Sequence, residues 1–175
     1  MRRSPNKVGG GFKTNLNGLS FEGRTDLLES FKQNPNFAVK DNKVLKNNKI
    51  VGEYYEKHSF YRSFLEKKGI DWKVINSKKY LPDAVFYNHE NSTVYVVEKK
   101  YQSGSGSVDE KLQTCDFKKK IYIKLITPLR LNVEYYYLLN NWFDKSEYDD
   151  VFSYIEEVNC KYFIEFIPFS KLGLD

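Results

Sequence analysis

Residues 80–102 read YLPDAVFYNHENSTVYVVEKKYQ, and the rest of the chain is best interpreted outward from them. Two runs rich in valine and aromatic residues flank a polar segment of five residues, which predicts a β-hairpin. Both runs carry charge at the same end of this hairpin. Asp83 begins the first run, and Glu98, Lys99 and Lys100 end the second.

The register of the hairpin decides where these charges lie. A turn between Asn88 and Thr93 places Asp83 directly opposite Glu98. Opposed side chains of antiparallel strands share a face, with Cβ atoms about 4.5–5.5 Å apart. Because strand side chains alternate, Lys100 and Gln102 lie on the face of Glu98. We therefore expect two carboxylates, an ammonium and an amide together, unless the register slips by one residue.

This group of side chains suits one kind of chemistry. Two neighbouring carboxylates repel each other, and both stay ionised when a cation lies between them. Carboxylate oxygens prefer a hard divalent ion, Mg²⁺ first. Such an ion polarises a phosphoryl oxygen and activates water, and a nearby lysine stabilises the charge that builds on the phosphate. The hairpin therefore indicates phosphodiester hydrolysis.

The same residues resemble a known motif. Pro82-Asp83, fourteen further residues and then Glu98-Lys99-Lys100 are similar to the PD-(D/E)xK motif of the restriction-endonuclease-like nuclease superfamily. The resemblance implies that Asp83 and Glu98 hold Mg²⁺, which Mn²⁺ would replace, and that Lys100 is the catalytic lysine of the motif. Lys99 would be its variable middle residue. The alternative is a surface hairpin with a charged end. We favour the nuclease because the motif lies on two predicted strands.

Composition is compatible with this interpretation. A chain of 175 residues is most simply one domain, and its 14 tyrosines and 13 phenylalanines exclude a disordered chain. The net charge of +5 suits nucleic acid without proving it. Cys115 and Cys160 have no zinc spacing, so we expect buried thiols in a reducing compartment. Without a signal peptide or a long apolar run, we expect a cytoplasmic protein that does not enter a membrane.

The N-terminal segment, residues 1–18, is basic, contains no acidic residue and includes three consecutive glycines. One interpretation is a solvated tail. The other is a basic arm that lies along DNA phosphates and uses Lys13.

A first helix is predicted from Asn17, as N-cap, to Gln33. Its buried stripe has i, i+4 spacing and ends with Leu27 and Phe31. The resemblance implies that an acidic residue on this helix supports the metal, and Glu22 fits that role better than Asp26. An ordinary solvated acidic face is the alternative for both.

Three elements are expected before the charged hairpin. A small hairpin surrounds Asp41-Asn42, a helix covers Glu53 to Lys68 and ends at Gly69, and the first core strand covers Asp71 to Ile75.

A second long helix follows the charged hairpin. A capping box from Ser107 to Glu110 starts it at Val108, and Pro128 stops it after Ile126. Its buried side is predicted to contain Leu112, Cys115, Tyr122 and Ile126. Lys118, Lys119, Lys120 and Lys124 form a basic cluster, which is either a solvated face or, for Lys118 and Lys119 with Lys99, a contact to the DNA backbone.

Strand and helix alternate again at the end of the chain. We expect a strand over Asn132 to Leu139, an acidic helix over Lys145 to Asn159 and a strand over Tyr162 to Ile167. The whole order predicts an α/β fold, with a mixed sheet covered by helices on both faces. Residues 19–140 would form an α-β-β-β-α-β core and residues 141–175 a C-terminal α-β addition. This core order agrees with the resembled superfamily.

The sequence thus favours a Mg²⁺-dependent endonuclease on double-stranded DNA, most like a small type II restriction enzyme. Asp83, Glu98 and Lys100 would be catalytic, with Glu22 and Gln102 in support. Cutting both strands would require a homodimer. Alternatives are a junction-resolving, homing or repair nuclease with the same core, or a nucleic-acid-binding module without catalysis.

Overall fold

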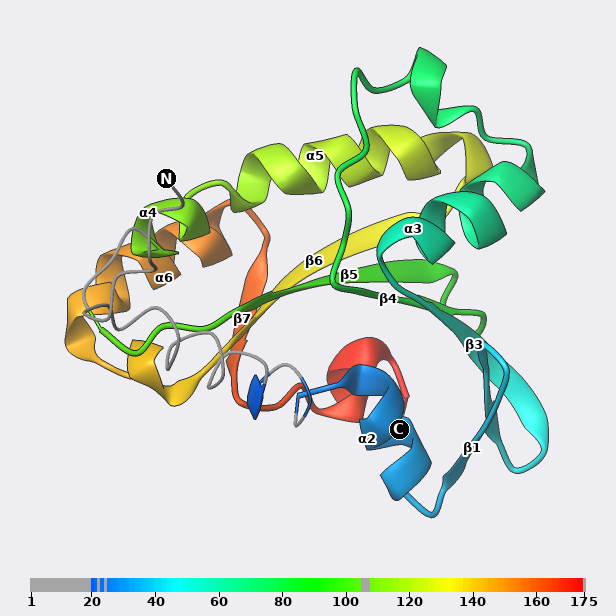
Figure 1. Cartoon of the computed structure of the whole chain (residues 1–175), viewed down its shortest axis with the longest axis horizontal. Coiled ribbons are helices and arrows are strands. Elements are labelled where there is room, and N and C mark those ends of the chain that lie inside the picture. The colour runs from blue at the N-terminus through cyan, green and yellow to red at the C-terminus, as the bar shows by residue number, and fades with distance from the viewer. Residues whose placement is uncertain (1–19, 22, 24, 105–107, 175) are drawn as a thin grey trace, which may run out of the picture.

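A computed structural model describes residues 20–174, apart from 22, 24 and 105–107. Seven strands form one sheet whose spatial order is the chain order (Figure 1). The first five strands pair antiparallel, and the last two add in parallel. The predicted mixed α/β sheet is therefore confirmed. The strands are β1 (Phe37–Lys40), β2 (Lys43–Lys46), β3 (Lys49–Tyr55), β4 (Ala84–Asn88), β5 (Thr93–Lys100), β6 (Asn132–Leu139) and β7 (Lys161–Ile164).

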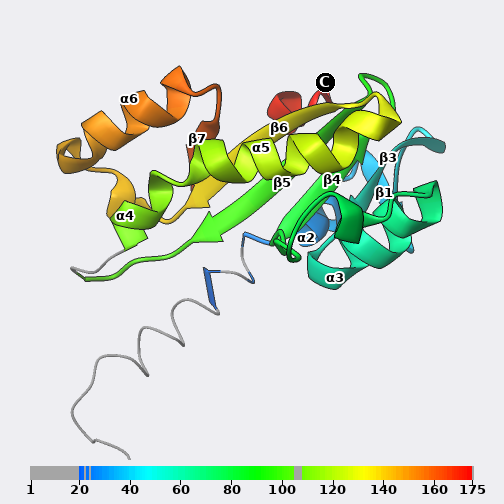
Figure 2. The ribbon, with the colours of Figure 1, turned by 90° about the horizontal axis from the view of Figure 1, so that it is seen from above.

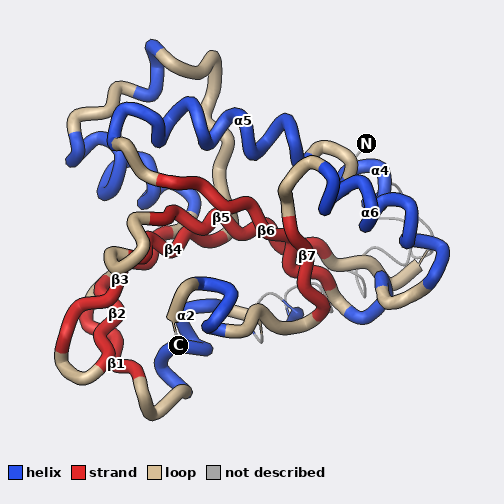
Figure 3. The backbone as a smooth tube through the Cα atoms, turned by 180° about the vertical axis from the view of Figure 1, so that it is seen from behind, coloured by secondary structure: helices blue, strands red, loops and turns tan. Residues whose placement is uncertain are grey.

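Helices cover both faces of the sheet. α2 (Leu27–Gln33) lies on one face, beside the C-terminal 3₁₀ turn Phe169–Leu172. The other face carries α3 (Lys57–Ser59), α4 (Val108–Leu112), α5 (Cys115–Ile126) and α6 (Asp149–Glu157) (Figures 1 and 2). Seen from behind, α5 crosses one face of the strands while α2 lies on the opposite face (Figure 3).

Each face of the sheet has its own apolar core, and β5 contributes alternate side chains to both. Val94 and Val96 point into the core under α5, where Phe64 and Leu125 are fully buried. Tyr95 and Val97 point into the core under α2, with Phe31. Side-chain alternation therefore assigns Glu98 and Lys100 to the α5 face and Lys99 to the α2 face.

The predicted register of the charged hairpin is confirmed. Ala84 pairs with Val97, Phe86 with Tyr95 and Asn88 with Thr93. Asp83 is the residue immediately before β4, so it continues this register toward Glu98. The small hairpin around Asp41-Asn42 is also confirmed, as β1 and β2.

Two predictions between residues 49 and 75 were wrong. Residues 53–55 belong to β3, where Tyr54 pairs with Phe86 and Tyr55 with Val85. The helix begins only at Lys57 and continues through a π-helical turn (Phe60–Leu65) and a 3₁₀ turn (Glu66–Lys68), ending at Gly69 as expected. Residues 71–75 form no strand. Asp71 caps the 3₁₀ turn Trp72–Val74, and Val74 is 82% exposed.

The predicted first helix is interrupted. Thr25 Oγ1 donates to the carbonyl of Phe21 at 2.6 Å, and Asp26 caps α2 by accepting from Leu28 N at 2.8 Å. Asp26 is thus committed to the helix start, which explains the separate helix. The expected N-cap Asn17 and the expected metal supporter Glu22 lie outside the described residues.

The predicted second helix is divided at Gln113-Thr114 into α4 and α5, since Thr114 Oγ1 donates back to the Lys111 carbonyl at 2.7 Å. Its start at Val108, its end at Ile126 and its four buried residues are confirmed, whereas Ser107 lies outside the described residues.

The C-terminal elements follow the predicted order with shifted ends. β6 has its predicted bounds. A 3₁₀ turn (Ser146–Tyr148) precedes α6, and β7 stops at Ile164 because Glu165 has φ +60°. Cys115 and Cys160 are both buried, as predicted. Within the described part of the chain, no helix combines the length and apolarity needed to cross a membrane.

Candidate functional site

The site lies where β4 begins and β5 ends, under α5. Two buried tyrosines hold the segment that leads into β4, at Tyr80, by hydrogen bonds. The hydroxyls of Tyr61 and Tyr122 donate to the Tyr80 carbonyl at 2.9 and 3.0 Å, and the Tyr80 N–H donates to the Tyr61 hydroxyl. Lys57 N also donates to the Pro82 carbonyl at 2.9 Å. The chain therefore enters β4 along a fixed path, with Asp83 at its start.

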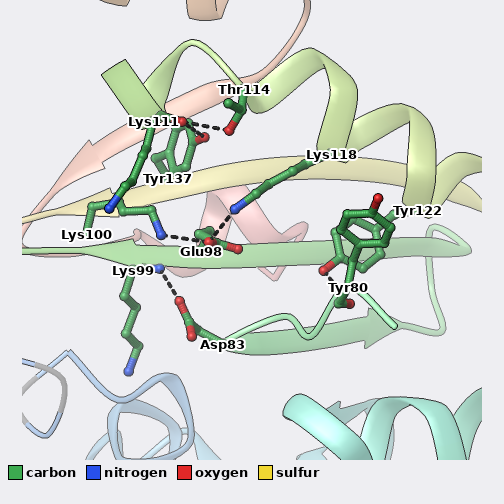
Figure 4. Close-up of polar contacts among 10 residues, drawn as sticks. All are labelled: Tyr80, Asp83, Glu98, Lys99, Lys100, Lys111, Thr114, Lys118, Tyr122 and Tyr137. Carbon is green, nitrogen blue, oxygen red and sulfur yellow. Dashed lines mark hydrogen bonds and ion pairs between the residues drawn. The ribbon is translucent and has the colours of Figure 1, made fainter. Parts of the chain in front are cut away.

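Glu98 is the buried charge of the site, with 8% of its surface exposed. Its Oε1 accepts from Lys100 Nζ at 2.6 Å and from Lys118 Nζ at 2.5 Å (Figure 4). Lys100 comes from the same strand face, and Lys118 reaches down from α5. Burial, the largest single influence, raises the pKa of Glu98, but the two ammoniums together outweigh it and lower that pKa. Glu98 is consequently ionised at neutral pH.

Asp83 is held by the backbone of the neighbouring strand. Its Oδ2 accepts from the Lys99 N–H at 2.8 Å (Figure 4). Both carboxylates affect Tyr122. Burial raises the pKa of its phenol most, and the negative charges of Glu98 and of Asp83 raise that pKa further. Both negative charges are therefore within electrostatic range of one hydroxyl, which lies under α5.

Gln102 occupies the end of the same strand. Its N–H donates to Asn140 Oδ1 at 3.0 Å, and Asn140 Nδ2 donates to its carbonyl at 2.9 Å. This exchange fastens the exit of β5 to the exit of β6. The side-chain oxygen of Gln102 is buried and accepts no hydrogen bond from the part of the chain described. A buried amide oxygen without a partner is costly, and it is also a ligand type that divalent cations accept.

The predicted DNA-binding lysines are dispersed. The Lys99 side chain extends away from Glu98, on the other side of β5 (Figure 4). Lys119 donates to the Asn159 carbonyl and Lys120 pairs with Asp116, so the basic cluster is not one continuous face. Lys118 alone of this cluster contacts the predicted catalytic carboxylate. Lys13 lies outside the described residues.

The contact between Lys118 and Glu98 was not predicted, although the sequence contains a signal for it. Lys118 follows Cys115 by three positions and precedes Tyr122 by four, so it falls on the buried stripe of the helix. A lysine in such a stripe needs an acidic partner beneath it. Tyr122 was predicted only as a core residue, whereas its hydroxyl also fixes the segment before Asp83.

The donor set fits a hard cation, with one condition. Lys100 and Lys118 both contact Oε1 of Glu98, so a divalent ion would bind this carboxylate against the repulsion of two ammoniums. In the described ranges, no three His, Cys, Asp or Glu side chains form a metal-binding group. Two carboxylates would hold the ion, and amide, water or substrate oxygens would complete its shell.

Comparisons of the chain with protein-family models, with curated proteins and with solved structures each found no match.

Proposed function

We propose that the protein is a Mg²⁺-dependent DNA endonuclease whose active centre is formed by Asp83, Glu98 and Lys100. The observation that carries the proposal is the buried, ionised Glu98 held by two ammoniums at a hairpin end that Asp83 shares. A buried ion triad is weak as a stabilising device, because apolar residues of similar volume often serve as well. Its position beside a second carboxylate favours a chemical role.

Asp83 and Glu98 would hold the metal, which when bound supplies Lewis-acid activation of the phosphodiester. Lys100 lies 2.6 Å from Glu98, on the face where the attacked phosphate would sit. Its ammonium would orient the attacking water and stabilise charge that develops on the phosphate. Lys118 approaches from α5 and would bind a phosphate oxygen once its contact with Glu98 weakens. Gln102 would support the site through its unpartnered amide oxygen.

The element order supports the proposal as well. A helix, β3, the β4–β5 hairpin, α5 and the parallel strand β6 can be matched to the α-β-β-β-α-β order of the restriction-endonuclease-like superfamily, with β3 in place of the strand expected at residues 71–75. In this match β1 and β2 are additions after the first helix, and α3 is an addition between β3 and β4. Cleavage of both strands of a duplex, as a type II restriction enzyme performs it, would need a homodimer. A junction-resolving, homing or repair enzyme is the alternative within the same chemistry.

A nucleic-acid-binding module without catalysis is the second candidate. One specific observation favours it: the charge of Glu98 is already compensated by Lys100 and Lys118, so the site requires no metal to be stable.

Cleavage assays on plasmid, linear phage, branched and single-stranded DNA separate the two candidates. We expect Mg²⁺-dependent products with the wild-type protein, none with EDTA, and none with Asp83→Asn or Glu98→Gln. Glu157→Gln, which changes an exposed carboxylate on α6, is the matched control and should cut normally. Discrete bands would establish sequence specificity. DNA binding without cleavage of any duplex, branched or single-stranded substrate would favour the binding module.

A further inference from the structure

Beside the charged site, α5 and the segment before β4 form an exposed surface of aromatic and basic residues. We define the Phe117 surface as Phe117, Tyr80, Leu81 and Lys78. Phe117 is 54% exposed and Leu81 39% exposed. The rings of Phe117 and Tyr80 meet edge to face, with centroids 5.8 Å apart. An apolar ring this exposed, on a rigid support, is suited to contact a flat partner.

This surface is continuous with the proposed active centre. Phe117 directly precedes Lys118, whose ammonium contacts Glu98. Tyr80 stands three residues before Asp83, and its carbonyl accepts from Tyr122, one helical turn beyond Lys118 (Figure 4). The Phe117 surface therefore shares both of its supporting elements, α5 and the segment before β4, with the proposed active centre.

The charges around the surface suit an anionic strand. Residues 72–82 contain three lysines and no acidic residue. Lys78 Nζ lies 5.1 Å from the centroid of the Tyr80 ring, and Lys79 Nζ lies 4.9 Å from that of Trp72. Exposed aromatic rings interleaved with lysines are the combination by which proteins hold unpaired nucleotides, since bases stack on the rings and phosphates contact the ammoniums.

We propose that the Phe117 surface binds an unpaired base of the DNA strand next to the cleaved phosphate. A base inside a duplex has both faces covered by its neighbours and cannot stack on Phe117. The inference rests on the proposed nuclease function and narrows its substrate to DNA with unpaired nucleotides near the cut. It thereby favours a repair or junction-resolving role over restriction of intact duplex.

The chain offers a matched control for Phe117. Phe166, which follows β7, is also 54% exposed and also meets a single ring edge to face, that of Phe169 at 6.4 Å. Its partner Phe169 packs against the core under α2, on the sheet face opposite to Glu98. Phe117→Ala and Phe166→Ala therefore remove equally exposed rings from two different surfaces.

The test is equilibrium binding of the full chain, in EDTA, to a duplex carrying a single-stranded flap and to a fully paired duplex of equal length. A fluorescent 2-aminopurine in the flap reports stacking. We expect Phe117→Ala to weaken flap binding at least about fivefold and to abolish the quenching of 2-aminopurine, whereas Phe117→Trp and Phe166→Ala retain both. Binding to the paired duplex should change little.

Equal effects of Phe117→Ala and Phe166→Ala, or equal losses on flap and duplex, would overturn the inference. So would a loss of self-association in Phe117→Ala with unchanged DNA binding, because the surface would then be a protein contact. Parallel cleavage assays in Mg²⁺ keep the two proposals apart. If the wild type cuts and Phe117→Ala binds the flap normally, only the base contact fails. If Phe117→Ala loses flap binding but no substrate is ever cut, only the nuclease fails.

Discussion

The two ends of the β4–β5 hairpin bury polar groups in opposite ways. At the turn, Asn88 is fully buried and makes four neutral hydrogen bonds: its amide donates to the carbonyls of Leu172 and Gly173, and its oxygen accepts from the N–H groups of Glu90 and Asn91. At the open end, Glu98 is nearly as buried but is surrounded by charges. Neutral, fully paired amides fix structure, whereas clustered charges with perturbed pKa values occur most often at functional sites.

The largest expected difference between the two ends is in activity. Glu98→Gln or Asp83→Asn should lower Mg²⁺-dependent cleavage at least about 100-fold, because each removes a charge that the proposed chemistry uses. Asn88→Ala should leave the rate per folded molecule unchanged. Rates measured on fractions shown to be folded by circular dichroism check this. Comparable losses at both ends would mean that the hairpin acts only through its stability.

At the turn, we expect a loss of stability and not a loss of activity. Asn88→Ala removes four hydrogen bonds, of which the one to the Leu172 carbonyl is buried and the other three are partly buried, which should lower the free energy of unfolding by about 2 kcal/mol. Urea denaturation measures the change, with exposed Asn141→Ala as the control, for which we expect less than about 0.5 kcal/mol. If Asn88→Ala is as mild as the control, Asn88 does not fasten the C-terminal turn to the hairpin.

Lys118 contacts only the charged end of the hairpin, so its removal leaves the turn at Asn88 intact. Lys118→Ala should weaken DNA binding and reduce the slope of log K against log salt by about 1, as expected for one lost phosphate contact. Lys124→Ala, a neighbouring exposed lysine on α5, is the control for general charge loss. A salt slope that Lys118→Ala leaves unchanged would restrict Lys118 to pairing with Glu98.

The smallest expected effect is the pH dependence of stability. The folded-state pKa of Glu98 is lowered, so its contribution is complete above the ordinary carboxyl pKa, near 4.5, and is lost as pH falls through the lower folded value. The difference in unfolding free energy between wild type and Glu98→Gln should therefore narrow in acid. Urea midpoints from pH 7 down to acid test this. A difference that narrows instead as pH rises would contradict the ion triad.

The charged hairpin shows both what the sequence could predict and what it could not. The alternation of valines and aromatics with a polar turn specified the register, because a slip would exchange the two buried faces of β5. The order of the later elements followed from helical and strand periodicity. The approach of Lys118 to Glu98 depends on where α5 crosses the sheet, and only the buried stripe of that helix hinted at it.

The strand β3 shows why another part was missed. Lys49, Gly52 and Glu53 make residues 49–55 look unlike a core strand. Gly52 is required there by packing, since a Cβ would stand 2.4 Å from the ring of Phe86 on β4. This requirement comes from a contact with another strand, so it leaves no recognisable pattern in the sequence around Gly52. Conversely, Trp72 to Ile75 look like a strand, but Asp71 caps them into a 3₁₀ turn.

The most direct test of the account is Mn²⁺ binding, followed by electron paramagnetic resonance of the free ion. We predict one or more sites per chain in the wild type and in Asn88→Ala at a temperature where it is folded, and their loss in Glu98→Gln and Asp83→Asn. Equal Mn²⁺ binding by wild type and both carboxylate variants would contradict the account, and would leave the charged end of the hairpin as a structural ion triad.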